Sequence, residues 1–170
     1  DWSSDVCSSD LVMLFSDAGK AVRFDENDVR PMGRTARGVR GMNLGDGQEV
    51  IAMLVAPAEV TEGGQASVED ASAPSSVLTA TENGYGKRTP IAEYTRHGRG
   101  TKGMIAIQTS ERNGKVVAAA LVSPEDQIML ITTGGVLVRT RVSEIREMGR
   151  ATQGVTLINV DEGTHLSGLQ

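Results

Sequence analysis

The hydrophobic pattern of the chain contains three short apolar runs that lie far apart in the sequence. They cover residues 12–16, 77–81 and 128–132, and each contains β-branched residues and ends shortly before a glycine. Short apolar runs bounded by turn residues are typical of buried strands, because helices need longer periodic segments. The sequence therefore predicts three strands that each lead into a hairpin turn.

These runs open three copies of one repeat, and no copy needs an internal gap. A turn glycine follows each run at a fixed offset, an arginine lies four residues later, and two more glycines follow at constant spacing. Self-similarity of this kind indicates a repeat protein. The turn glycines are Gly19, Gly84 and Gly135; the arginines are Arg23, Arg88 and Arg139; the later glycines are Gly33, Gly98 and Gly149, then Gly38, Gly103 and Gly154.

Each copy is predicted to contain about four strands in roughly 50 residues, which is typical of a propeller blade. After the first strand come a return strand, a loop with one buried anchor, the double-glycine turn, a third strand and a closing strand. The return strands are residues 20–24, 86–89 and 136–140, the anchors are Val29, Tyr94 and Ile145, the third strands are 39–44, 104–108 and 155–160, and the closing strands are 49–56, 115–123 and 164–170.

Three blades at 12–56, 77–123 and 124–170 account for most of the chain, and we expect the last to be incomplete. Residues 57–76 are rich in Ala, Ser, Glu and Gly without hydrophobic period, which predicts a flexible insertion between blades. Residues 1–11 resemble the translation of a sequencing-library adaptor, and the alternative is a native, disordered N-terminus. On the adaptor interpretation, the chain is a truncated fragment, and its end units would expose apolar strand edges.

Composition places the chain among globular proteins of a reducing compartment. No apolar stretch approaches the roughly 20 residues of a membrane helix, and Cys7 is the only cysteine. The net charge is −5, but residues 19–42, 84–107 and 135–158 hold 15 of the 17 Lys and Arg against 6 of the 22 acids, or +9. Such segregation predicts a basic stripe on an acidic protein, although charged turns on solvated loops would give the same count.

The sequence gives little support for a catalytic or cofactor-binding motif. Residues 98–103 match G-x-G-x-x-G, but a dinucleotide site needs a preceding strand and a following helix, and the other copies lack the middle glycine. His97 and His165 stand alone, without metal-ligand spacing. Tyr94 aligns with the core anchors, and Tyr85 follows a hairpin turn, so neither is favoured as a nucleophile. We expect no catalytic residue, metal or cofactor in this chain.

The basic residues of the glycine turns are the strongest functional signal. Arginines follow the second glycine of each copy, and Arg37 and Lys102 precede the third. Glycine-turn amides flanked by guanidinium groups suit phosphate oxygens, so repeated turns could follow a duplex backbone without reading bases. For Arg23, Arg88 and Arg139, pairing inside the blade is an equal alternative. The predicted DNA-binding residues are Arg34, Arg37, Arg99, Lys102, Arg150, Arg23, Lys87, Arg88, Arg139 and Arg141.

Several of these motifs resemble the C-terminal domain of the DNA gyrase A subunit. They are Gly84-Tyr85-Gly86-Lys87-Arg88-Thr89, Gly19-Lys20-Ala21-Val22-Arg23-Phe24, residues 32–41, 111–114 and 138–145. The resemblance covers residues 12–170, except for the insertion. It implies an all-β fold, a β-pinwheel in which neighbouring blades exchange a strand, and it corresponds to the last three blades.

The resemblance also implies function. It implies binding and wrapping of double-stranded DNA, the remainder of the gyrase A subunit and the gyrase B subunit as partners, and a cytoplasmic, nucleoid-associated place in a bacterium. The ATP and Mg²⁺ of the holoenzyme would be used elsewhere. The glutamine-arginine-glycine-lysine box of the first blade and the catalytic tyrosine are absent from this sequence. The equivalent domain of the topoisomerase IV A subunit and a propeller-type protein-interaction module remain alternatives.

Overall fold

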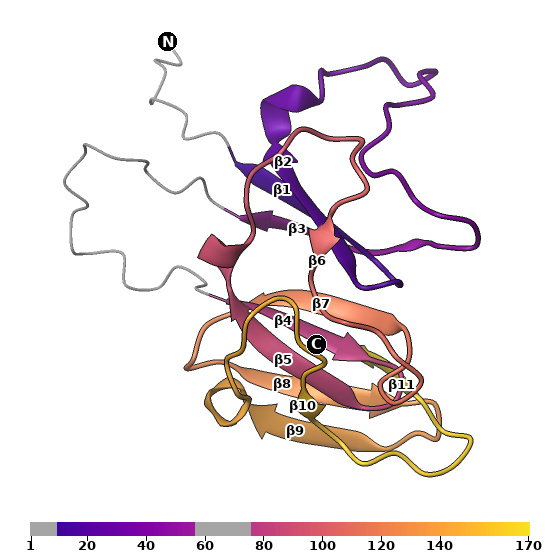
Figure 1. The fold of residues 1–170 in the computed structure, drawn as a ribbon, viewed down its shortest axis with the longest axis vertical. Helices are drawn as coiled ribbons and strands as arrows, with labels where there is room; N and C mark the ends of the chain where they lie inside the picture. Colours follow the sequence, from indigo (N-terminus) through magenta and orange to yellow (C-terminus); the bar gives the residue numbers. More distant parts are fainter. Residues whose placement is uncertain (1–9, 57–75) are drawn as a thin grey trace, which may run out of the picture.

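A computed structural model describes residues 10–56 and 76–170, and within them the fold is all-β with antiparallel sheets (Figure 1). The predicted insertion at 57–76 lies outside these residues except for Ser76, and so do residues 1–9 of the adaptor-like segment. The strands are β1 (Leu11–Ser16), β2 (Lys20–Asp25), β3 (Val50–Ala56), β4 (Ser76–Thr81), β5 (Tyr85–Pro90), β6 (Met104–Ile105), β7 (Val116–Val122), β8 (Gln127–Thr132), β9 (Leu137–Arg141), β10 (Val155–Thr156) and β11 (Leu166–Leu169). Short 3-10 turns η1 (Glu26–Asp28), η2 (Ile91–Glu93) and η3 (Val142–Glu144) follow β2, β5 and β9.

The three predicted apolar runs form β1, β4 and β8, and each continues into an antiparallel hairpin. The β1–β2 hairpin pairs Met13 with Arg23 and Phe15 with Ala21. Gly19, Gly84 and Gly135 all have φ near +80°, a conformation that glycine adopts without steric cost. The hairpin predictions are therefore confirmed in all three copies.

Strand exchange between neighbouring repeats is the feature that organises the fold. The sheet orders are β3-β1-β2-β6, β10-β5-β4-β7 and β11-β8-β9, so β6 of the second repeat completes the first sheet and β10 of the third completes the second. Lys20 pairs with Ile105, and Tyr85 pairs with Thr156 (Figure 1 shows β6 beside β2). The resemblance implied this exchange, whereas the periodicity alone placed each third strand within its own unit.

The third strands are shorter than predicted. We expected strands at 104–108 and 155–160, but only Met104–Ile105 and Val155–Thr156 pair as strands, because the next two residues bend and donate their amides to the glycine of the neighbouring hairpin turn. The first copy forms no strand at 39–44, where the described chain shows only a parallel bridge between Met42 and Thr101. That segment would need the outer edge of a preceding blade.

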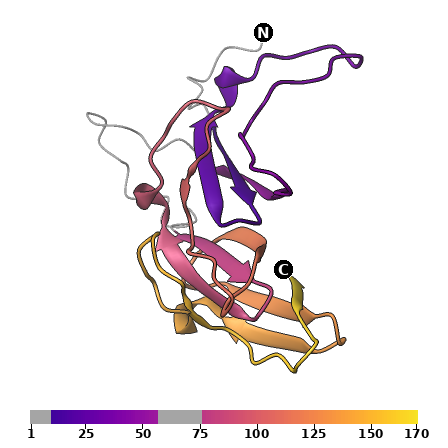
Figure 2. The same ribbon diagram turned by 45° about the vertical axis from the view of Figure 1, so that its right-hand side comes forward.

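The core lies between consecutive sheets, which are stacked along the molecule (Figure 2). Tyr94 is 1% exposed, and its ring meets Phe15 of the preceding repeat edge-on with centroids 6.0 Å apart. Ile145 is buried as predicted, but Val29, the third predicted anchor, is 39% exposed. An anchor of this kind packs on the preceding repeat, and none lies before Val29 in the described chain. No helix among the described residues is long and apolar enough to span a membrane.

Candidate nucleic-acid interface

Two of the repeated arginines point into the protein and join consecutive repeats. Arg23 on β2 is 4% exposed, and its Nη1 donates to the carbonyl oxygens of Tyr94 at 2.9 Å and Ile91 at 3.3 Å. Arg88 on β5 donates from Nε to the carbonyl oxygen of Ile145 at 2.7 Å. Tyr94 and Ile145 hold the same position in successive repeats. The structure thus favours the structural role that sequence reasoning left open for these arginines.

Lys87 is fully buried beside the glycine turn of the third repeat. Its Nζ donates to the carbonyl oxygens of Gly149 and Arg150 and to Oγ1 of Thr152, the last at 3.0 Å. Burial lowers the pKa of Lys87 to about 8, partly opposed by the nearby carboxylate of Glu93. An ammonium enclosed in this way fixes the turn, which favours a structural role over contact with DNA.

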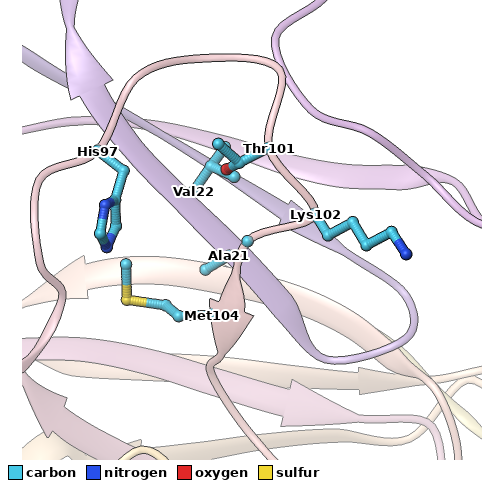
Figure 3. A pocket seen from close by; sticks show the side chains of 7 residues that line it. Ala21, Val22, His97, Thr101, Lys102 and Met104 are labelled. Atoms are coloured by element: carbon cyan, nitrogen blue, oxygen red, sulfur yellow. The ribbon is translucent and has the colours of Figure 1, made fainter.

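A cavity occupies the equivalent place in the first repeat, where Val22 stands at the position of Lys87 (Figure 3). It measures about 260 Å³ and is lined by β2 and the turn before β6, including Val22, His97, Thr101 and Met104. Valine is too short to fill the space that the lysine side chain takes in the next blade. His97 is exposed and lines this cavity, and its amide donates to the carbonyl oxygen of Arg23 at 2.8 Å.

The glycine-turn arginines form a second set of contacts between repeats. Nη1 of Arg99 donates to the carbonyl oxygen of Arg40 at 3.2 Å, and Nη1 of Arg150 donates to that of Ile105 at 3.0 Å. Arg40 and Ile105 hold equivalent positions. Arg99 also donates from Nε to the carbonyl oxygen of Asp28, and the amide of Arg150 donates to Oε2 of Glu93. These two arginines therefore have intramolecular partners, although Arg99 remains exposed.

The remaining predicted cations lie on the surface. They are Arg34, Arg37, Lys102, Arg139 and Arg141, which are all exposed. Lys102 extends away from the cavity beside it (Figure 3). The DNA contacts predicted for these side chains, and for the five that bond within the protein, stay predictions.

Sequence reasoning missed one member of this exposed group. Arg40 is exposed, and its segment lies against the next repeat, where the amide of Asn43 donates to the carbonyl oxygen of Thr101 at 2.8 Å. That contact brings the chain around Arg40 beside the chain around Lys102. Repeat alignment alone gave no signal, because Ile105 and Thr156 are the equivalents of Arg40. We call Arg37, Arg40 and Lys102 the basic turn cluster.

Metal-ligating residue types and the two tyrosines are the groups to consider for metal binding or catalysis among the described residues. Within residues 10–56 and 76–170, no cluster of three or more His, Cys, Asp or Glu could hold a metal ion. The Tyr94 hydroxyl is enclosed in the core, and burial raises its pKa well above the ordinary value, which disfavours the phenolate. The Tyr85 ring is covered by the Arg112 guanidinium at 4.4 Å.

Comparison with known proteins identifies the family. The chain matches the family described as DNA gyrase C-terminal domain, beta-propeller, over residues 10–57, 75–123 and 126–169. The chain belongs to this family. The match covers nearly all of the described residues and leaves out residues 1–9, 58–74, 124–125 and 170.

Curated relatives are gyrase A subunits of bacteria. The DNA gyrase A subunit of Pseudomonas aeruginosa is 51% identical over 159 residues, which cover 94% of this chain and 16% of that protein. The Escherichia coli K12 protein of the same name is 50% identical, with 95% and 17% covered. The chain thus spans about a sixth of the length of these relatives.

Solved structures agree on the fold. A DNA gyrase A C-terminal domain superposes with a TM-score of 0.79 at 28% identity, covering 96% of this chain and 51% of that one. The C-terminal domain of DNA topoisomerase IV superposes with a TM-score of 0.81 at 21% identity, covering 96% and 46%. The second likeness supports the architecture alone.

Proposed function

We propose that this chain binds double-stranded DNA without sequence preference and helps to wrap it, as part of the gyrase A subunit. The observation that carries the proposal is the division of its cations into two classes. Arg23, Lys87 and Arg88 hold the repeats together, whereas the three residues of the basic turn cluster are exposed, and the chain around Arg40 lies against the second repeat. A rigid scaffold that presents cations at this rim suits a phosphate backbone.

The distribution of charge supports the same conclusion. The segments around the glycine turns carry +9 within a chain of net charge −5, so the remainder carries −14. Acidic surface elsewhere repels the duplex and confines it to the rim. We propose that these cations contact phosphate groups and not base edges, and we therefore expect binding with little sequence preference.

The names of the relatives, of which this chain spans about a sixth, support a proposal for the wider role. As a module of the gyrase A subunit, the chain would act beside the gyrase B subunit in a cytoplasmic, nucleoid-associated holoenzyme that couples ATP hydrolysis to negative supercoiling. The chain itself would bind the duplex and set its wrapped path, and it would carry out no bond-making step. The equivalent domain of the topoisomerase IV A subunit would present the same fold to DNA.

Duplex binding across a salt series tests the proposal. Anisotropy of a fluorescein-labelled 40-base-pair duplex, titrated with the chain between 50 and 200 mM salt, should give a log–log slope of about −3 or steeper, since each phosphate contact contributes about 0.9. Two duplexes of unrelated sequence should give the same slope. A slope near zero would contradict DNA binding and favour a protein-interaction module.

A further inference from the structure

We propose that a pocket beside the basic turn cluster binds a phosphate group between Lys20 and Lys102. The pocket measures about 240 Å³. The residues that line it are Lys20, Asn43, Leu44, Gly45, Gln48 and Lys102. The phosphate group belongs either to the DNA backbone, a case that rests on the proposed function, or to a free phosphate, a case that does not.

The second repeat shows what fills the equivalent place there. Tyr85 and Gln153 hold the positions of Lys20 and Lys102, and the Arg112 guanidinium contacts both of them. Its Cζ lies 4.4 Å from the centre of the Tyr85 ring, and its Nη1 donates to Oε1 of Gln153 at 3.4 Å. An aromatic face and an amide oxygen both attract a cation. The second repeat therefore fills this place with a positive charge of its own.

The backbone around the two places is arranged alike. The strand pairs β2–β6 and β5–β10 have the same register. The amide of Asn43 donates to the carbonyl oxygen of Thr101 at 2.8 Å, and the amide of Gln108 donates to that of Thr152 at 2.9 Å. The two places can therefore be compared residue by residue.

Two residue differences within the first repeat open the pocket. In each loop a backbone amide donates to an amide side chain three residues later, at 2.9 Å in the first repeat and 2.6 Å in the second. This shared turn aligns Gly47 with Arg112. Glycine has no side chain to enter the place, and Lys20 stands where Tyr85 supplies the ring. The space thus results from the residues of this repeat.

The same differences invert the charge of the place. Two lysine side chains, Lys20 and Lys102, replace the aromatic ring and the amide oxygen, and each ammonium offers three donors and no acceptor. Gln48 adds an amide whose oxygen accepts from the backbone, so its other hydrogen-bonding groups are N–H donors. Asp46 of the same turn is exposed, where salt screens its charge. A cationic lining rich in donors selects an anion rich in acceptor oxygens, such as a phosphate group.

Titration with inorganic phosphate tests the pocket without DNA. Amide proton–nitrogen spectra of the 170-residue chain are recorded at neutral pH and constant ionic strength, up to about 50 mM phosphate. We expect saturable shifts for the amides of Asn43, Gly45 and Lys102. Saturation separates a site from general screening, which changes signals without reaching a plateau.

Three lysine variants locate the binding site. Lys20→Gln and Lys102→Gln should each weaken phosphate binding about fivefold, the upper end for a partly exposed charge pair. Lys115→Gln makes the same charge change at a lysine whose side chain is 69% exposed, and it should bind phosphate like the parent. The proposal is overturned if the parent shows no saturable shift, or if Lys115→Gln weakens binding as much as the other two variants.

Duplex binding distinguishes the two sources of the phosphate group. For a backbone phosphate, Lys20→Gln should make the log–log salt slope shallower by about 0.9, while Lys115→Gln keeps the parental slope. An unchanged slope in a variant that has lost phosphate binding assigns the pocket to free phosphate groups. A parent that binds phosphate but no duplex contradicts the proposed function and supports the pocket.

Discussion

Replacing Gly84 with alanine is expected to lower the free energy of unfolding by about 3 kcal/mol, since a positive φ costs a non-glycine residue about 1–2 kcal/mol and each lost hydrogen bond about 1 kcal/mol. The amides of Leu157 and Ile158 donate to the Gly84 carbonyl oxygen at 2.7 and 3.2 Å, and the new Cβ would displace that segment. Urea titration followed by circular dichroism measures the change.

Gly47→Ala is the matched control for this experiment. Gly47 also has a positive φ, of +70°, but nothing lies within 4 Å of its Cβ position. Its substitution should therefore cost only the conformational part, about 1–2 kcal/mol. Equal losses of unfolding free energy for the two variants would contradict the role of Gly84 in binding the exchanged segment at Leu157 and Ile158.

Replacing Lys87 with methionine should destabilise the protein at pH 7 by about 2 kcal/mol, since hydrogen bonds to a charged group contribute about 1.5–3 kcal/mol. The substitution keeps the apolar stem but removes the donor that holds the carbonyl oxygens of Gly149 and Arg150. Lys102→Met, at an exposed lysine of a glycine turn, is the control and should change stability little. Unfolding midpoints in urea measure both effects.

The pH dependence of the free energy of unfolding, compared between the parent and Lys87→Met, tests whether the buried group is the Lys87 ammonium. The folded-state pKa of Lys87 is about 8, below the ordinary 10.5, so between these values the unfolded chain binds more protons. The free energy of unfolding of the parent should therefore rise from pH 8 to about 10.5 relative to Lys87→Met. Ionisation of Tyr94 in the unfolded chain acts on both proteins and cancels. A difference independent of pH would contradict the assignment.

Much of the fold could be predicted from residue spacing alone. The three apolar runs and their turn glycines located β1, β4 and β8 and their hairpins, because strand burial and positive φ leave strong local signals. The third strands were predicted too long. Their pairing partners lie on another repeat, and periodicity within one segment carries no information about a distant edge.

The candidate site was harder to predict, because arginine and lysine serve two purposes here. Arg23 and Lys87 are buried among backbone carbonyl oxygens, whereas Lys102 is exposed, and residue type alone does not separate them. Type and spacing do not tell which carbonyl groups a long side chain reaches. Val29 could not be placed from spacing either, because the burial of this position depends on contact with a preceding repeat.

Duplex binding by a variant of the basic turn cluster tests the central claim most directly. Arg37, Arg40 and Lys102 are changed together to alanine, and the control changes the exposed Arg112, Lys115 and Arg146, so the net charge falls equally. We expect the log–log salt slope of the cluster variant to be shallower by about 2.7, three contacts at about 0.9 each, while the control keeps the parental slope. Equal slopes for the two variants would contradict the claim that this cluster contacts the DNA backbone.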